Sequence, residues 1–394
     1  MSAFRLRAAQ AITPPGVLEP AEITIAGDRI LSVEAADLSG EWSDDGLLQA
    51  PDLTLAPGLI DLHTHGIDGF DVMGTGLAAA AACYPSRGVT CFMPTTWPAP
   101  IDQLNSGLAA MAATDTPPLG ARIAGVHLEG PFLAPERPGM ADPADFMIPS
   151  LERFVELQQA SAGRIRRVTL APELPGAMEL ISRLTAEGIA VSIGHSDADY
   201  ETTRRAFRHG ATQVTHAFNA LRPFHHRAPA AIGAALLDTE IWLELIADGV
   251  HLHPAAIELC RRLKPDRLLI ASDSVPPAGL PPGDYRWANR NLSLRADRST
   301  LADGTLAGSA RSLDQHLAYL VTQFDLPLAE AIRWASTAPA DSMGWTELGR
   351  LEPGALADLV LLDQQLAPAA TFVAGRLVWA RQPARWPMDL AGQA

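Results

Sequence analysis

The chain has 394 residues, 47% of them hydrophobic and 19% charged, which is long enough to bury a large core. Its formal net charge of −15 argues against a nucleic acid or an anionic membrane surface as a partner. The 3 cysteines form no CxxC pair, and no run of signal-peptide or membrane-spanning type is found, so we expect a cytoplasmic protein.

Both ends of the chain carry short strand patterns. Near the N-terminus, Ile23–Ile25 and Ile30–Val33 flank a Gly-Asp turn and predict a hairpin. Three more strands are predicted close to the C-terminus, at Asp358–Asp363, Ala370–Val373 and Leu377–Trp379. We therefore expect residues 1–56 and 346–394 to form one small, discontinuous β-sandwich domain.

The central region, residues 57–345, alternates predicted strands with helical patterns such as Met178–Glu187 and Asp199–His209. This alternation favours an α/β fold with a (β/α)8 TIM barrel, and a doubly wound open sheet is the alternative. The open sheet is disfavoured because no G-x-G-x-x-G or Walker A motif follows an early strand. The predicted strands are Leu59–His63, Val89–Pro94, Ile123–Leu128, Val168–Ala171, Ala190–Ile193, Gln213–Thr215, Leu243–Ile246 and Leu268–Ala271.

Histidines and carboxylates follow five of these strands. His63 and His65 are spaced i, i+2, so on a strand both imidazoles lie on one face. The other candidates at strand ends are Glu129, His195, His216 and Asp273. In a barrel, such residues meet at the carboxyl ends of the strands. Imidazole with carboxylate suits zinc or iron(II), whereas magnesium and calcium prefer oxygen ligands.

Several longer motifs resemble those of one family. With these motifs, the chain resembles the N-acetylglucosamine-6-phosphate deacetylases of the amidohydrolase superfamily. The resemblance implies a metal-dependent hydrolase that releases acetate from the N-acyl amide of an amino-sugar 6-phosphate. The motifs are PGLIDLHTHG (57–66), HLEGPF (127–132), IGHS (193–196), THAFNA (215–220), HHR (225–227), ADGVHLHP (247–254), DGTLAGS (303–309) and LEPGALADLVLL (351–362).

The resemblance also implies roles for the candidate ligands. Glu129, His195 and His216 match the residues that hold the main metal. His63 and His65 match a pair that holds a second metal in some members. Asp273 matches the catalytic aspartate and is counted with the metal ligands. We therefore expect one or two divalent ions per subunit, zinc or iron(II).

The substrate implied by the resemblance is a small phosphorylated amino sugar. His251 matches a histidine that reaches the neighbouring subunit's site, which implies a homodimer. The other residues that match substrate-binding positions are Asn219, Ala220, Arg227, Leu306, Ala307 and Gly308.

Two positions depart from the family pattern. Ala141 stands where similar sequences carry a histidine that contacts the amide carbonyl of the substrate, and Ser274 stands where they usually have alanine. Loss of such a donor removes an interaction worth about 3 kcal/mol in other enzymes. Either the metals polarise the carbonyl alone, or the natural acyl group or sugar is different.

Other functions remain open on the sequence alone. A related amidohydrolase could act on N-acetylgalactosamine-6-phosphate, another acyl amino sugar or an N-acyl amino acid. A dihydroorotase-like or D-aminoacylase-like enzyme would share the HxH pair and the final aspartate, but many such relatives use a carboxylated lysine as bridging ligand. The only lysine, Lys264, lies between the last two predicted strands, so Glu129 is the expected bridge. A non-catalytic sugar-phosphate binder is the third alternative, and the complete ligand set argues against it.

Overall fold

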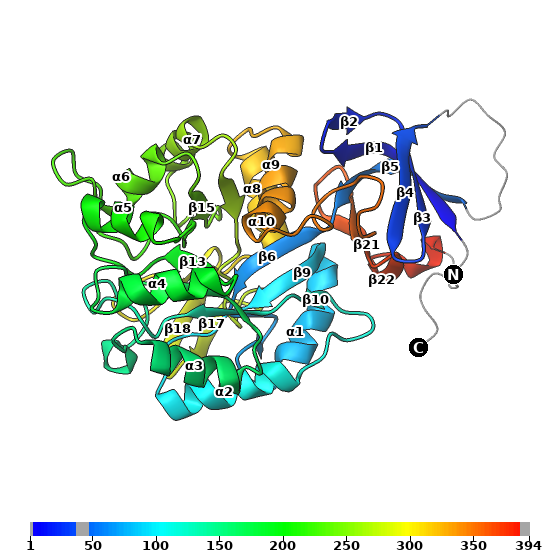
Figure 1. Ribbon diagram of the computed structural model, residues 1–394. Coiled ribbons are helices and arrows are strands. Elements are labelled where there is room, and N and C mark those ends of the chain that lie inside the picture. Colours follow the sequence, from blue (N-terminus) through cyan, green and yellow to red (C-terminus); the bar gives the residue numbers. More distant parts are fainter. Residues whose placement is uncertain (1–2, 37–46, 387–394) are drawn as a thin grey trace.

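The computed structural model describes residues 3–36 and 47–386 of the chain. Residues 1–2, 37–46 and 387–394, which belong to the terminal segments of our domain prediction, lie outside the described residues. The described part has the mixed α/β fold that the sequence predicts (Figure 1). No helix in this part is both long enough and apolar enough to cross a lipid bilayer.

Both ends of the chain contribute strands to one 8-stranded sheet, drawn in blue and red in Figure 1. The strand order is β22-β21-β20-β5-β1-β3-β4, with β2 paired to β1. The predicted hairpin is formed by β3 and β4, which pair antiparallel. The strands are β1 (Phe4–Thr13), β2 (Gly16–Leu18), β3 (Ala21–Ala26), β4 (Arg29–Ala35), β5 (Leu47–Pro57), β20 (Leu359–Leu362), β21 (Pro368–Val373) and β22 (Arg376–Ala380).

The long strand β5 connects this sheet to the central region. It pairs with β1 and β20 and then continues, after Gly58, directly into β6 (Leu59–Thr64). A side chain at position 58 would not fit, because a Cβ there would lie 2.1 Å from Oγ1 of Thr90. This close approach seats β6 against the neighbouring strand β9 (Val89–Pro94), with which it pairs in parallel.

The central strands form two sheets, one of 3 strands in the order β10-β9-β6 and one of 6 strands running from β11 to β16. Isolated parallel bridges connect them, from Thr95 to His127 at one edge and from Thr64 to Ser274 at the other. The carboxyl ends of the parallel strands therefore meet on one side. The remaining strands are β10 (Arg122–Ile123), β11 (Val126–Glu129), β12 (Ile165–Leu170), β13 (Ala190–Ile193), β14 (Gln213–Val214), β15 (Trp242–Leu245) and β16 (Leu268–Ile270).

The prediction of one strand over Ile123–Leu128 is wrong, because the structure divides this segment into β10 and β11. The chain changes partner between them. The Ala124 N–H bonds to the carbonyl of Phe92 in β9, whereas the Val126 N–H bonds to the carbonyl of Arg164, just before β12. An apolar run predicts extended backbone, but it does not show where the chain stops pairing with one neighbouring strand and begins to pair with another.

Helices surround the central strands (Figure 1). The two helices singled out from the sequence are present as α4 and α5, within one residue of their predicted ends. The α-helices are α1 (Leu77–Cys83), α2 (Ile101–Ala113), α3 (Leu151–Ala160), α4 (Ala177–Ala186), α5 (Tyr200–Arg208), α6 (Ala230–Leu237), α7 (Pro254–Leu263), α8 (Leu313–Thr322), α9 (Leu328–Ala335) and α10 (Thr337–Ser342). The 3-10 helices are η1 (Tyr84–Arg87), η2 (Pro143–Asp145) and η3 (Pro383–Arg385).

The sequence analysis did not predict two antiparallel elements that follow strands. A small pair, β7 (Gly66–Ile67) with β8 (Phe70–Asp71), follows β6. After β16, three strands form a separate sheet: β17 (Gly283–Trp287), β18 (Arg290–Arg295) and β19 (Arg298–Thr300).

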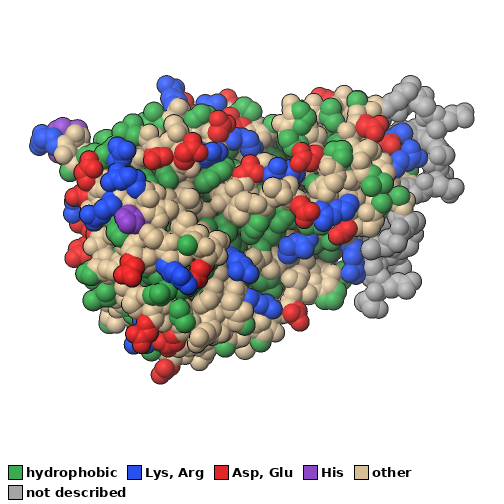
Figure 2. Space-filling view, in the orientation of Figure 1, with side chains coloured by type: hydrophobic (Ala, Val, Ile, Leu, Met, Phe, Trp, Pro, Cys, Tyr) green, Lys and Arg blue, Asp and Glu red, His purple; other side chains and the backbone are tan. Residues whose placement is uncertain are grey.

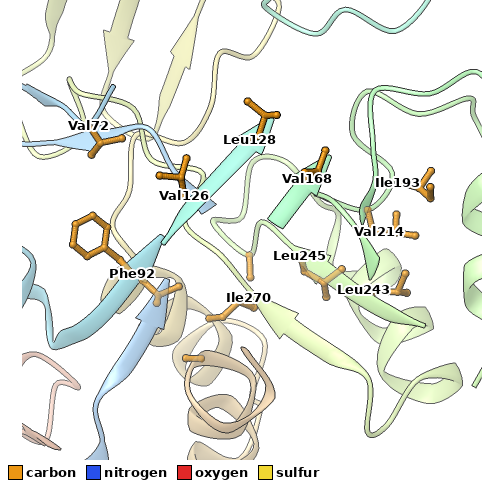
Figure 3. Packing of buried hydrophobic residues seen from close by; sticks show 14 of the residues in the cluster. Val72, Phe92, Val126, Leu128, Val168, Ile193, Val214, Leu243, Leu245 and Ile270 are labelled. Carbon is orange, nitrogen blue, oxygen red and sulfur yellow. The ribbon is translucent and has the colours of Figure 1, made fainter. Parts of the chain in front are cut away.

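One apolar cluster joins the central strands to the helices around them. Figure 3 shows members of this cluster on successive strands, among them Phe92, Leu128, Val168, Leu245 and Ile270. Each of these side chains is fully buried. This packing fixes the strands as a rigid base for the loops that follow them.

A second apolar cluster lies in the terminal sheet. Its Phe372 is fully buried, with its ring centroid 6.2 Å from that of Phe4 and 6.2 Å from that of Trp386. We predict that Phe372→Ala lowers the free energy of unfolding by about 3–5 kcal/mol, because it leaves a cavity between these rings. Urea denaturation gives the value.

Phe224→Ala is the control, because Phe224 is 55% exposed. We expect this change to alter the free energy of unfolding by less than about 0.5 kcal/mol. Equal effects of the two substitutions would show that Phe372 does not support the terminal sheet.

Candidate active site

Two clusters of buried histidines and carboxylates lie at the carboxyl ends of the central strands. In each cluster, the potential ligand atoms lie within 4.8 Å of one another. His63 is the last residue but one of β6, His65 directly follows that strand, and Glu129 ends β11. The other three residues lie just beyond their strands. One cluster contains His63, His65 and Asp273, and the other contains Glu129, His195 and His216. All six residues therefore meet as the sequence predicts.

The carboxylate of Glu129 lies between the two clusters. Its Oε1 is 3.2 Å from Nε2 of His195 and 3.1 Å from Nε2 of His216. Its Oε2 is 3.3 Å from Nε2 of both His63 and His65. Oδ1 of Asp273 faces the same two imidazoles, at 3.4 and 3.2 Å. Each carboxylate oxygen of Glu129 thus faces the imidazole nitrogens of one cluster.

The donor atoms fit divalent cations. Nε2 of His195 and Nε2 of His216 are only 3.1 Å apart, although both face the same oxygen of Glu129. The buried Nε2 of His63 has no hydrogen-bond partner in the described structure. Nitrogen lone pairs that converge with carboxylate oxygens in this way are typical ligands of a divalent transition metal.

The backbone is strained at three of these residues. The backbone φ angles of His195, His216 and Asp273 are positive, at 45°, 29° and 48°. Residues other than glycine rarely adopt such angles. At Asp273, two hydrogen bonds hold this conformation: its N–H donates to the carbonyl of His63, and its carbonyl accepts from Ser309. Gly308 permits the close approach, since a Cβ there would lie 2.7 Å from the Asp273 carbonyl oxygen. Such strain is typical of functional sites.

A second layer of polar groups orients the imidazoles. His63 donates from Nδ1 to Oε1 of Glu244 at 2.9 Å, and the same oxygen accepts the backbone N–H of His216 at 3.1 Å. The other oxygen of Glu244 accepts from the buried Arg167 at 2.6 Å. Nδ1 of His195 donates to the carbonyl of Arg137 at 3.0 Å. In both His63 and His195, Nε2 is left free to act as a ligand.

Opposite charges determine the pKa values in the clusters. Burial alone would lower the pKa of His63, but nearby carboxylates, Glu129 first among them, raise it well above its ordinary value. Burial would also lower the pKa of His65, yet its hydrogen bonds to Asp273 and Glu129 raise it to about 9. Burial alone would raise the pKa of Glu129. The surrounding imidazoles outweigh the effect of burial and lower this pKa well below its usual range. The clusters therefore favour ionised carboxylates and bound positive charge.

The clusters open into a pocket of about 430 Å³. Asn219 and Ala220 line it, and so do Leu306 and Gly308, whereas Ala307 is buried behind them. The pocket therefore contains four of the six substrate-binding residues that the resemblance assigned to this chain, besides His251.

His251 lines the pocket of its own chain, whereas we expected it to reach a neighbouring subunit's site. It follows β15, so its loop lies at the same strand ends as the clusters. Its Nδ1 donates to Oδ2 of Asp248 at 2.7 Å. Burial lowers the pKa of His251, but Asp248 more than offsets this and raises it. The raised pKa thus favours the protonated form of this imidazole.

Arg227, like the buried Ala307, does not line this pocket. It lies on the exposed loop 223–228 before α6, where it donates to Nε2 of His226 at 2.7 Å. Figure 2 shows histidine and basic side chains projecting at the corner where Figure 1 draws this loop. Arg227 therefore lies on an exposed loop and does not line the pocket of its own chain.

Sequence reasoning missed several residues that shape the site. Glu244 and Arg167 are charged residues inside apolar strands, and this contrast was the available signal. Trp97 and Trp287 line the pocket, but no local pattern marked them. Trp287 enters the pocket only because β17 and β18 pair as a hairpin.

Comparison with known proteins agrees with this geometry. Residues 54–378 match the Amidohydrolase family. The N-acetylglucosamine-6-phosphate deacetylase of Vibrio furnissii is 35% identical over 355 residues, which cover 89% of this chain and 88% of that protein. The N-acetylgalactosamine-6-phosphate deacetylase of Escherichia coli O157:H7 is also 35% identical, over 94% of this chain and 98% of that protein.

The chain belongs to the amidohydrolase family. It is a metal-dependent hydrolase of carbon–nitrogen amide bonds, and its resemblance to the amino-sugar-phosphate deacetylases is confirmed. A solved structure of a Mycobacterium smegmatis N-acetyl-D-glucosamine-6-phosphate deacetylase variant, in complex with N-acetyl-D-glucosamine-6-phosphate, is 32% identical. It matches with a TM-score of 0.89 and covers 96% of this chain and 100% of that chain.

The second layer around this amidohydrolase site can be tested at Glu244. We predict that Glu244→Gln weakens metal binding about 10–100-fold, because the neutral amide orients His63 less strongly. Competition with a chromophoric chelator measures the affinity. Glu240→Gln is the matched control, since the Glu240 side chain is 77% exposed. Equal affinities of the two variants would contradict the role of Glu244.

Proposed function

We propose that this amidohydrolase removes the N-acyl group of an amino-sugar 6-phosphate, with N-acetylglucosamine-6-phosphate as the leading substrate and glucosamine-6-phosphate and acetate as products. The observation that carries the proposal is the pocket, which joins two ligand clusters to His251, Asn219 and Ala220. Relatives that act on the gluco and the galacto sugar are equally similar, so N-acetylgalactosamine-6-phosphate is the second candidate.

Asp273 is the proposed general base and acid. When a divalent cation is bound, it supplies Lewis-acid activation of water and of the amide carbonyl. The carboxylate of Asp273 accepts a proton as the water oxygen bonds to the carbonyl carbon. It then returns that proton to the amide nitrogen as the carbon–nitrogen bond breaks, which yields an amine and a carboxylic acid that ionises to the carboxylate. Imidazoles led by His63 lower the pKa of Asp273 against the effect of burial and keep it ionised for the first step.

The metal proposed for the site is zinc or iron(II), with one or two ions per chain. Imidazole-plus-carboxylate ligation supports this choice over magnesium or calcium. The two oxygens of Glu129, each facing its own cluster, support a pair of ions. The lone Lys264 donates to the carbonyl of Asp238, so it is not available as a carboxylated bridging ligand.

The architecture proposed around the site is a closed (β/α)8 barrel over residues 57–345, made of β6, β9 and the strands from β11 to β16. The two isolated bridges between the central sheets support closure. A separate β-sandwich domain from residues 1–56 and 346–394 is supported by the apolar cluster that both chain ends share. A crystal structure with the edges of β6 and β16 apart would contradict the barrel.

We also propose that the protein acts as a homodimer in which Arg227 binds the phosphate group in the partner's pocket. The support is its position on a projecting loop, outside the pocket of its own chain. A guanidinium is well suited to a phosphate because it offers paired donors.

Acetate release from N-acetylglucosamine-6-phosphate by the zinc- or iron(II)-loaded protein tests the function. We expect turnover to depend on the phosphate and to fall at least about 1,000-fold in Asp273→Asn, which loses the proton acceptor but keeps bound metal. Asp266→Asn is the control, because the side chain of Asp266 is 83% exposed. Near-full activity of Asp273→Asn would contradict the assignment of the general base.

The phosphate anchor has its own test. We predict that Arg227→Ala raises KM for the phosphorylated sugar at least about tenfold, because a charge-assisted contact is lost, and leaves the value for N-acetylglucosamine unchanged. Arg208→Ala, an exposed position on α5, is the control. If Arg227→Ala affects both sugars equally, or if sedimentation shows a monomer with full activity, the proposed role is wrong.

A further inference from the structure

Two tryptophans form an aromatic wall beside one of the candidate ligands. The ring centroid of Trp287 is 5.3 Å from that of His65 and 6.2 Å from that of Trp97. Both indoles line the pocket, yet Trp97 is only 9% and Trp287 only 6% exposed. The loop after β9 supplies Trp97, and the end of β17 supplies Trp287. Neither residue has a part in the reaction described above.

Asp71 fixes this wall in place. Its Oδ2 accepts the indole N–H of Trp287 at 2.9 Å, and its Oδ1 accepts the backbone N–H of Met73 at 2.8 Å. Trp287 is the last residue of β17, and the turn Ala288–Asn289 that follows has positive φ angles of 49° and 58°, typical of a tight hairpin turn. The indole is therefore held at a defined position over His65.

The wall lies beside the ligand cluster that contains His65, whereas the predicted sugar-binding residues Asn219 and Ala220 closely follow His216 of the other cluster in sequence. Trp287 packs against His65, and Trp97 packs against Trp287. If the amide carbon sits at the clusters and the sugar extends toward Asn219, the acyl group must extend toward His65. The pocket lining continues from Trp97 into the apolar Pro98 and Pro100, and the charged Asp142 and Arg290, which also line the pocket, are paired with each other.

The position of Ala141 agrees with binding of an apolar acyl group on the tryptophan side of the pocket. Ala141 lines the pocket, and the next residue, Asp142, forms an ion pair of 3.4 Å with Arg290, across the turn from Trp287. The small methyl group of Ala141 offers no hydrogen-bond donor to a carbonyl. The ion pair thus connects the segment of Ala141 to the hairpin that carries Trp287.

We propose that Trp287 and Trp97 form the acyl subsite of this enzyme and that the subsite favours N-acyl groups longer than acetyl. This inference rests on the proposed deacylation. Hydrolysis of the carbon–nitrogen bond would then release propionate, butyrate or an aromatic carboxylate together with the amino-sugar phosphate. Fixed indole faces bind such chains at low entropic cost, and each buried methylene adds about fourfold to kcat/KM.

The test compares kcat/KM for N-acetyl-, N-propionyl-, N-butyryl- and N-benzoyl-glucosamine-6-phosphate with the metal-loaded protein. We expect kcat/KM to rise with acyl length in the wild type and in Trp287→Phe, which keeps an aromatic face. In Trp287→Ala, we expect the rise to flatten to less than about twofold per methylene, because the contact surface is lost. Trp379→Ala, in the terminal sheet, is the control for loss of an indole elsewhere.

A flat or falling series in the wild type would overturn the proposal, and so would the same rise in Trp287→Ala as in the wild type. Calorimetric binding of the four compounds to Asp273→Asn provides a readout that does not need turnover. If no compound releases a carboxylate, the proposed function fails. The binding series then decides the subsite: affinity that rises with acyl length supports it, and affinity that does not overturns it.

Discussion

The carboxylate of Glu129 is buried among four imidazoles, and the ends of the central strands are arranged to meet it. A buried carboxylate without partners is strongly unfavourable, so this position depends on the residues around it. Those imidazoles come from three separate strand ends, those of β6, β13 and β14. The parallel register that aligns Glu129 with Thr169, and Ile193 with Val214, places the histidines at the same level as the carboxylate. The active site is therefore a consequence of strand register.

Hydrogen bonds beneath the ligands maintain that register. Asp61 in β6 accepts from both the backbone N–H and the hydroxyl of Ser272, at 3.1 and 2.5 Å, and so ties β6 to the residue before Asp273. Ser274, a departure from the family pattern, lies 2.9 Å from the hydroxyl of Thr64 and donates to the carbonyl of Gly66 at 2.8 Å. Its hydroxyl thus connects the end of β6 to the loop after β16, directly below the His63 cluster.

The sequence predicted the strand ends and the six candidate ligands because both follow local rules. Apolar runs mark the strands, and polar residues directly after parallel strands must share one edge. The structure adds what depends on long-range pairing. Glu244 and Arg167 form a buried ion pair 77 residues apart in sequence, which no local pattern reveals. Trp287 reaches the pocket through an unpredicted hairpin, and the HHR motif does not show that Arg227 lies on an exposed loop outside the pocket of its own chain.

The central claim is that Glu129 joins two cation positions with one oxygen each. Anomalous diffraction from crystals of the zinc-loaded protein tests it most directly. The account predicts two peaks about 3.5–4 Å apart. Glu129 should contact both, with His63, His65 and Asp273 around one peak and His195 and His216 around the other. Two peaks that do not share Glu129, or full activity with a single peak and no metal at His63 and His65, would contradict it.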